Sequence, residues 1–276
     1  MRYKITSFVV LAGALGLLGT FFSPTPVLAE TACSVQNWDA SEGLDDSNTG
    51  TQGGSNRRFF GPCGLRVAFG SGERWLENNR ATGGSTIDAD TYKARLFGFF
   101  DDLAGSDVPF FRAYDDSDNP VFTLYFDESK GLGAAITSDG SVDDWISIGN
   151  GWQQIEMGFT SGESFDFAIN DEIRILDSSI AALISYVRLG DIEGVGSGSV
   201  DFDEFDSRRT SYPSEDEASV ILRGDATNSG SVTLADAAAI ADEVFGGPFA
   251  PGQSDCLGNG RVTLADTACV ADIVFN

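Results

Sequence analysis

The middle of the chain alternates between apolar and polar residues with a period of two. The clearest case is the segment FDFAI at 165–169, where Phe165, Phe167 and Ile169 lie on one side of an extended chain. Four other segments have the same period, and their residues predicted to share a buried face are Leu65, Val67 and Phe69; Arg95, Phe97 and Phe99; Phe122, Leu124 and Phe126; and Ile155, Met157 and Phe159. This pattern predicts antiparallel strands that are buried on one side.

Turn residues separate the predicted strands. They form the clusters DDSDNP at 115–120, SDGS at 138–141 and TSGE at 160–163. The last two strands are predicted from Ile184, Tyr186 and Arg188, and from Val200 and Phe202, whereas 179–183 fits either a helical turn or a strand. Many short strands without a long helical pattern predict a mainly β protein, an antiparallel jelly-roll sandwich.

The pattern changes at the C-terminal end, where a segment is repeated. Residues 225–245 recur at 255–275, thirty positions further on (255 minus 225). Apolar residues at helical spacing occupy the second half of each copy, at Ala237, Ile240, Ala241, Val244 and Phe245 and at Val270, Ala271, Val274 and Phe275. Each copy therefore predicts a loop followed by a helix, and the two apolar faces are expected to bury each other.

Each loop has the spacing of a twelve-residue calcium-binding loop. Both copies place an acid at position 1, glycine at 6, a hydroxyl at 9 and an acid at 12, and a hard cation needs such oxygen atoms at alternating positions. The predicted calcium ligands are Asp225, Thr227, Ser229, Ser231, Thr233 and Asp236 in the first loop, and Asp255, Asn259, Arg261, Thr263 and Asp266 in the second. Leu257 cannot be a ligand, and two carboxylates per loop predict weak sites. Alternatively, the loops fold without metal and an aspartate caps each helix.

These two units resemble a dockerin, the module that attaches secreted polysaccharide-degrading enzymes to cohesin domains. The resemblance covers 224–276 and implies calcium as the cofactor and a cohesin-like domain as the partner. It also implies that the dipeptide at loop positions 10 and 11 faces this partner, which is Leu234-Ala235 in one copy and Leu264-Ala265 in the other. The chain departs from the family at loop positions 3 and 5, where dockerins usually have Asn or Asp.

The N-terminal 29 residues have the pattern of a signal peptide. Arg2 and Lys4 precede an apolar run at 8–22, and small residues at 27–29 suit a cleavage site. A membrane anchor is the alternative, but the run is short for a membrane span and contains glycines. We expect a secreted protein without membrane insertion after cleavage. A flexible arm is predicted at 30–59, the jelly roll at 60–210 and a polar linker at 211–223.

The four cysteines fit two disulfides in a secreted chain. Three pairings are possible, and proximity in the sequence favours Cys33 with Cys63 and Cys256 with Cys269. The absence of histidine and of a CxxC motif argues against a zinc site or a catalytic cysteine. A net charge of -25 argues against nucleic acid and anionic membranes as partners, because both require a basic surface.

The order of motifs in the β region resembles the concanavalin A-like, or laminin G-like, jelly rolls of bacterial secreted proteins. The motifs are CGLRV at 63–67, YKARLFGFF at 92–100, PVFTLYF at 120–126, GWQQIE at 151–156, VRLG at 187–190 and FDEFDSRR at 202–209. This superfamily contains lectins, adhesion modules and glycoside hydrolases, so the resemblance implies an extracellular glycan as a possible ligand but no single activity.

One acidic segment is the candidate for glycoside hydrolysis, which needs two carboxyl groups that flank the bond. It contains Asp201, Asp203, Glu204 and Asp206. Jelly-roll hydrolases of the laminarinase type carry ExDxE or ExDxxE on one strand, and this segment has neither. We therefore interpret these acids as a solvated strand face opposite the apolar residues at 200 and 202, and assign no catalytic residues.

Tryptophans are the other carbohydrate signal, because sugar rings stack on aromatic rings. The candidates are Trp38, Trp75, Trp145 and Trp152; Trp152 is predicted to be core, and Trp145 to lie near solvent. Together these features favour a secreted, non-catalytic carbohydrate- or matrix-binding protein that is joined to a partner by its C-terminal repeats. The alternatives are a glycoside hydrolase targeted by the same repeats, and a surface protein in which the repeats only cap the sandwich.

Overall fold

A computed structural model gives the fold of the chain. It describes residues 34–35, 38–49, 59–60, 63–78, 90–136, 142–177, 180–208, 213, 223–229, 231–247, 250–258 and 261–275. The predicted signal peptide at 1–29, most of the predicted linker, and both Cys33 and Asn259 lie outside these residues. Within the described residues, no helix is long and apolar enough to cross a membrane.

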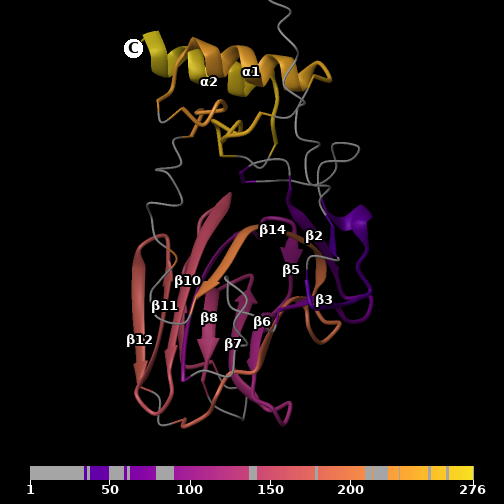
Figure 1. The fold of residues 1–276 in the computed structure, drawn as a ribbon, viewed down its shortest axis with the longest axis vertical. Coiled ribbons are helices and arrows are strands. Elements are labelled where there is room, and N and C mark those ends of the chain that lie inside the picture. Colours follow the sequence, from indigo (N-terminus) through magenta and orange to yellow (C-terminus); the bar gives the residue numbers. More distant parts are fainter. Residues whose placement is uncertain are drawn as a thin grey trace, which may run out of the picture. The chain divides into compact units, whose positions relative to one another are not determined.

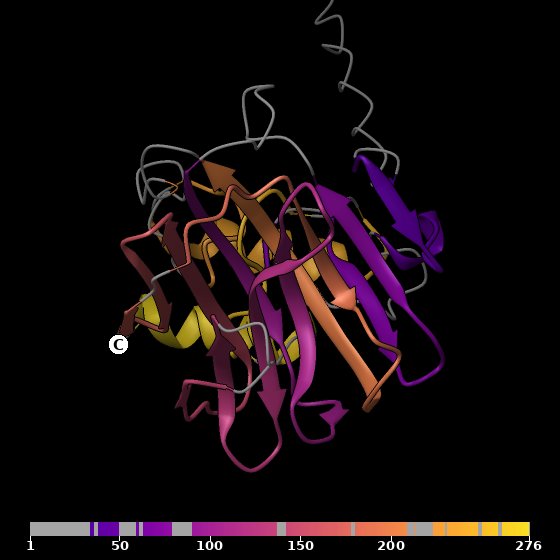
Figure 2. The same ribbon diagram turned by 90° about the horizontal axis from the view of Figure 1, so that it is seen from below.

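Two antiparallel sheets of the β region confirm a sandwich (Figure 1). Sheet A has the order β1 (Ala40–Glu42), β3 (Arg74–Asn78), β13 (Tyr186–Asp191), β6 (Val108–Tyr114), β7 (Pro120–Asp127), β8 (Gly131–Ala135) and β9 (Asp144–Ile146). Sheet B has the order β12 (Glu172–Asp177), β11 (Ser164–Ile169), β10 (Trp152–Thr160), β4 (Thr91–Phe99), β14 (Ser197–Arg208) and β2 (Leu65–Phe69), and β5 (Leu103–Ala104) pairs with β14. Figure 2 shows β3, β13 and β6 side by side in sheet A.

The core between the sheets is built from the alternating residues of most predicted strands. In β11, Phe165, Phe167 and Ile169 are buried, as the sequence predicts. The predicted faces of β2, β7 and β10 are confirmed in the same way, and so are Val200 and Phe202 of β14. Aromatic rings from both sheets contact each other in this core: the ring centroids of Phe122 in β7 and Phe165 in β11 are 4.6 Å apart.

The predicted inward face of β4 is wrong. Its alternate residues Tyr92, Ala94 and Leu96 enter the main core, whereas Phe97 and Phe99 belong to a second apolar cluster. Both faces of this strand are buried, so a period of two cannot say which one faces the other sheet.

Strand β13 is reversed as well. Val187 and Leu189 are in the core, and Tyr186 and Arg188 are on the outer face. The prediction failed because it continued the alternation from Ile184, which is buried but precedes the strand as an isolated bridge residue. Of the ambiguous 179–183 segment, residues 180–183 form neither helix nor strand.

Part of the predicted flexible arm is ordered. Residues 40–42 form β1, which pairs with β3 at the edge of sheet A, and a short 3₁₀ helix follows at Asp46–Asn48. All three β1 residues are exposed. The strand is therefore specified by backbone pairing alone, and no apolar alternation reveals it.

The C-terminal repeats fold as two helices, α1 (Leu234–Val244) and α2 (Leu264–Phe275). Their small core includes Ala237, Ile240 and Val270. The disulfide between Cys256 and Cys269 confirms the second predicted bridge and joins the second loop to α2. Cys63 is also in a disulfide, but its predicted partner lies outside the described residues.

The expectation that Phe245 and Phe275 contribute to this core is wrong. Their exposed fractions are 77% and 72%. Phe245 is the C-cap residue of α1 and Phe275 is the last residue of α2, so both lie at helix ends, beyond the buried positions Ile240 and Val270.

Candidate functional site

The first loop gathers its oxygen-bearing side chains around Asp225 and Asp236, and both carboxylates are buried. Asp236 Oδ1 accepts hydrogen bonds from the backbone nitrogen and the hydroxyl of Thr227, at 2.8 and 2.7 Å. Asp225 Oδ1 accepts one from the Ser229 nitrogen at 2.8 Å. The Thr227 hydroxyl also lies 3.5 Å from Asp225 Oδ1, so it stands between the two carboxylates.

The second oxygen of Asp236 holds the start of α1. Asp236 Oδ2 accepts hydrogen bonds from the nitrogen and the hydroxyl of Thr233, at 2.7 and 2.9 Å, and the Thr233 hydroxyl accepts one from the Ala235 nitrogen. These contacts form a capping box. A single carboxylate therefore joins loop position 3 to the first turn of the helix.

Opposing effects act on the pKa of Asp236. Burial raises the pKa of its carboxyl, but the hydrogen bonds from Thr227 and Thr233 together outweigh burial and hold this pKa below its usual value. The carboxyl is consequently ionised at neutral pH, as a metal ligand must be.

The second loop repeats this arrangement with one donor fewer. Asp266 Oδ1 accepts a hydrogen bond from the Leu257 nitrogen at 3.0 Å, and Asp266 Oδ2 accepts two from Thr263, at 2.8 and 3.0 Å. Asp255 is buried as well, and Arg261 is exposed. Because Leu257 has no hydroxyl, no side-chain oxygen stands at position 3 of this loop.

The donor set of the first loop fits calcium. Side-chain oxygens of Asp225, Thr227, Ser229 and Asp236 lie within 3.5 Å of a neighbouring member of the set, and the Ser231 carbonyl oxygen is 3.0 Å from the Ser229 hydroxyl. Calcium takes six to eight such oxygens. Within the described part of the chain, no three His, Cys, Asp or Glu side chains group around a metal position. Calcium here would therefore depend on hydroxyl and carbonyl oxygens besides two carboxylates.

The two predicted partner-facing dipeptides open the two helices in the same way. Leu234 and Leu264 have exposed fractions of 52% and 51%, and the alanine after each is exposed too. In both copies the nitrogen of that alanine donates to the preceding threonine hydroxyl at 3.2 Å. The repeats thus present two equivalent apolar side chains.

Two of the four acids in the β14 segment, at 201 and 203, are not solvated as the sequence suggested, whereas Glu204 is exposed and Asp206 is half buried. Asp201 is fully buried and forms an ion pair with Arg66 of β2 at 3.2 Å. Asp203 is buried on the same face and accepts hydrogen bonds from the nitrogens of Phe59 and Phe60, at 2.6 and 2.8 Å. The sequence interpretation assumed that the face opposite Val200 and Phe202 is exposed to water. In the structure, residues 59–60 lie against this face. Both carboxylates therefore have structural partners.

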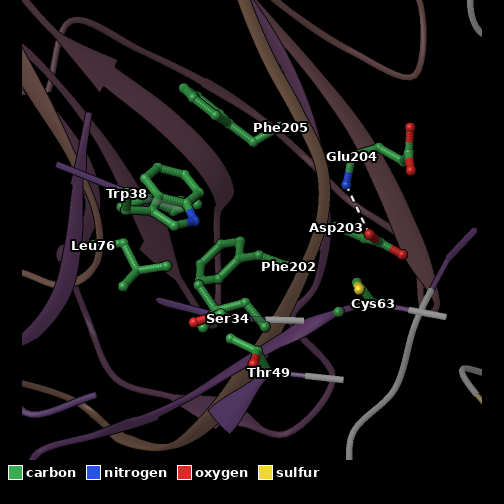
Figure 3. A pocket seen from close by; sticks show the side chains of 12 residues that line it. Ser34, Trp38, Thr49, Cys63, Leu76, Phe202, Asp203, Glu204 and Phe205 are labelled. Atoms are coloured by element: carbon green, nitrogen blue, oxygen red, sulfur yellow. Dashed lines mark hydrogen bonds between the residues drawn. The ribbon is translucent and has the colours of Figure 1, made fainter. Parts of the chain in front are cut away.

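Asp203 and its neighbour Glu204 border an apolar cavity of about 190 Å³ (Figure 3). Trp38, Phe202 and Phe205 form its aromatic side, and the two carboxyl groups point away from these rings. Burial, followed by the charge of Glu204, raises the pKa of Asp203 to about 8, against hydrogen bonds from three backbone nitrogens. The cavity thus has no pair of carboxylates directed into it.

The structure divides the four tryptophans between two environments. Trp152 is buried in the cluster with Phe97 and Phe99, which confirms that it is core, and Trp38 packs against the main core. Trp75 and Trp145 are half buried, and strand register places them on the same face of sheet A. The sequence did not reveal this pairing, because it depends on the order of six strands.

No protein-family model and no curated protein matches the sequence. Among solved structures, the cellulose-induced protein Cip1 is 13% identical with a TM-score of 0.45, covering 54% of this chain and 81% of its own. A Trypanosoma rangeli sialidase is 12% identical with a TM-score of 0.41, and only 26% of its chain is covered against 54% of this one. An alginate lyase of polysaccharide lyase family 7 is 10% identical with a TM-score of 0.40, covering 63% of this chain and 83% of its own. These proteins are distant in sequence and fold.

Proposed function

We propose that this protein is a secreted, non-catalytic binding protein whose C-terminal repeats take up calcium and dock onto a cohesin-like domain, while its β-sandwich holds an extracellular glycan. The observation that carries the proposal is the equivalence of the two repeats. In each, one buried carboxylate joins the loop to the helix start, and an exposed leucine follows the capping threonine.

This connection explains how calcium would act on docking. Asp236 accepts from loop position 3 with one oxygen and from the helix start with the other, so a cation held by this carboxylate would fix both segments together. Calcium would supply the positive charge that balances the two buried carboxylates of this loop. The residues that would hold it are Asp225, Thr227, Ser229 and Asp236. An ordered helix start then presents Leu234 in a fixed position.

The two copies differ in how their loops are held. The second loop lacks the position 3 hydroxyl but has the Cys256–Cys269 disulfide between loop and helix. We expect the first loop to depend more on calcium and the second more on its covalent link. The docking surface would then retain one ordered copy when calcium is scarce.

The experiment measures binding of residues 30–276 to a panel of purified cohesin domains by titration calorimetry, with calcium and with chelator. We expect binding that calcium strengthens, that survives Leu234→Asp or Leu264→Asp alone and that is lost when both are changed, because either copy can supply the contact; Leu264→Asp, which leaves only the first copy, should make binding depend most strongly on calcium. Phe245→Asp is the matched control, since it places a charge at an exposed apolar position of α1 outside the repeated dipeptide. Binding that the double change leaves intact would contradict the proposal, and so would the absence of binding across the panel.

A further inference from the structure

The outer face of sheet A carries a concentration of aromatic and arginine side chains. On β13, Arg188 lies directly opposite Glu77 of β3 and Arg112 of β6 in the strand register, and Tyr186 lies opposite Tyr114. The Arg188 guanidinium stacks over the Trp75 ring at 3.9 Å from the ring centroid. Alternate residues of one strand share a face, so all these side chains leave the sheet on the side away from the core.

The same face continues to the other edge of the sheet. Arg112 lies opposite Thr123 of β7, which lies opposite Ala135 of β8. Two residues before Ala135, Gly133 lies opposite Trp145 of β9. A Cβ atom at Gly133 would stand 2.6 Å from the Trp145 ring, so this ring rests directly on the glycine backbone. Trp75 and Trp145 are therefore the two large rings at opposite ends of one face.

The distance between these rings is set by the strand order. Five steps separate β3 from β9, and at about 4.8 Å per step the face extends about 24 Å across the strands. This span is several times the width of one sugar ring. A ligand that contacts both tryptophans must therefore be an extended polymer, and a single sugar is too small.

Each tryptophan is held by a cation, which restricts its movement before any ligand binds. Arg188 lies over Trp75, and Lys130 lies 4.6 Å from the Trp145 ring centroid. Arg188 is itself fixed by Glu77, with Nε 3.1 Å from the carboxylate. Rings that are fixed in advance lose little conformational entropy when a ligand stacks on them.

The charges of this face compensate one another. Arg188 pairs with Glu77, Arg112 pairs with Glu193, and Lys130 pairs with Asp107 and Asp127. The whole chain carries a net charge of -25, which repels polyanions. The charged side chains are thus suited to hydrogen bonding with hydroxyl groups, and a polymer without charge is the ligand that the face accommodates.

Groups that can form hydrogen bonds with sugar hydroxyls lie on the strands between the two tryptophans. Tyr186 donates to Asp118 at 2.6 Å and stacks on Tyr114 with centroids 4.7 Å apart. Burial, followed by the hydrogen bond to Asp118, raises the pKa of Tyr186 above its usual value, so its hydroxyl keeps its proton. Tyrosine, arginine and carboxylate groups together supply both donors and acceptors for sugar hydroxyls.

We infer that the outer face of sheet A binds a neutral polysaccharide chain laid across the strands. One sugar packs on the face of Trp75 opposite Arg188, another packs on Trp145 once the largely exposed Lys130 side chain moves off that ring, and hydroxyls bond near Arg188 and Tyr186. The inference rests on the glycan-binding part of the proposed function and gives it a location and a ligand class. It involves no residue of the calcium loops, so the two proposals can fail separately.

The test is affinity electrophoresis of residues 30–276 in gels containing neutral polysaccharides (β-glucan, xylan and mannan) or acidic ones (alginate and polygalacturonate). We expect retardation by at least one neutral polymer, in chelator as well as in calcium. Trp75→Ala and Trp145→Ala should each weaken binding about tenfold, the loss of one ring contact. Gly133→Ala should also weaken binding, because the added methyl displaces the Trp145 ring without removing it.

Phe245→Ala is the matched control, because it removes an exposed ring from α1 and should leave retardation unchanged. Trp145→Phe should restore most of the binding lost in the alanine variant, which separates loss of a ring from loss of the fold. No retardation by any neutral polymer, a preference for the acidic polymers, or binding unaffected by Trp75→Ala and Trp145→Ala together would each overturn the inference. Neutral-polymer binding with no response to cohesin domains would leave this inference standing and remove only the docking proposal.

Discussion

Replacing Asp236 by alanine removes the acceptor that joins the first loop to α1. In chelator, four donors lose their partner: the nitrogens and the hydroxyls of Thr227 and Thr233. Hydrogen bonds to a charged acceptor contribute about 1.5–3 kcal/mol each, but hydroxyls and part-buried nitrogens regain water. We therefore expect a cost of about 3–4 kcal/mol to the free energy of unfolding of the helical repeats.

Asp266→Ala is the matched change in the second copy. Asp266 accepts from only three donors, because Leu257 offers a nitrogen but no hydroxyl. The cost should be smaller by about 1 kcal/mol, the contribution of one hydrogen bond. Addition of calcium at a hundred times its dissociation constant stabilises the intact site by about 2.7 kcal/mol. The Asp236 variant should not show this gain from its first loop.

Two optical signals separate the parts of the full chain during urea unfolding. All four tryptophans lie between 38 and 152, so their fluorescence reports the sandwich. The only α-helices among the described residues are α1 and α2, so the helical band of the far-ultraviolet circular dichroism reports mainly the repeats. We expect both substitutions to shift the dichroism transition and leave the fluorescence transition in place. Equal costs at Asp236 and Asp266, or no cost at either, would refute the reasoning from hydrogen-bond partners.

Three further predictions concern two buried carboxylates of the sandwich and the disulfide of the repeats. Asp201→Ala should destabilise the sandwich by about 2 kcal/mol in urea unfolding, because it removes the buried carboxylate from Arg66, which keeps its contact with the exposed Asp102, and a neutral effect would contradict this. Asp203 has a folded-state pKa raised to about 8, so its contribution to stability is full below about pH 4 and is lost as pH rises towards 8; Asp203→Asn should flatten the fall of stability over this range, and an unchanged profile would exclude Asp203 as its source. Replacing both Cys256 and Cys269 by serine should lower the stability of the repeats by about 3 kcal/mol and steepen their dependence on calcium, whereas an unchanged calcium dependence would show that the bridge does not substitute for the metal.

The sequence predicts correctly those strands and helices whose local pattern is compatible with only one structure. Phe165, Phe167 and Ile169 alternate around polar residues on a strand with one buried face, and the structure buries all three. The tandem repeat likewise defines two helices, since the threonine and aspartate that start α1 by a capping box recur at Thr263 and Asp266 in the second copy.

Other features depend on which segments meet, and no local pattern contains that information. β4 has apolar residues on both faces, so Phe97 and Phe99 look like core residues although they face away from the main core. The outer face of sheet A needs β3, β13 and β9 to be in one sheet, and their tryptophans and arginine come from positions 75, 145 and 188. Asp203 is buried by residues more than a hundred positions away.

Calcium binding to the full chain tests the proposed docking module most directly. Titration calorimetry would compare residues 30–276 with a variant of the first loop, Asp225→Asn with Asp236→Asn, and with the same pair of changes at Asp255 and Asp266. We predict calcium uptake by the unaltered chain, a larger loss of affinity in the first variant than in the second, and no uptake when all four are changed. No binding heat for the unaltered chain, together with identical unfolding in calcium and in chelator, would contradict the proposal that the repeats form a calcium-dependent docking module.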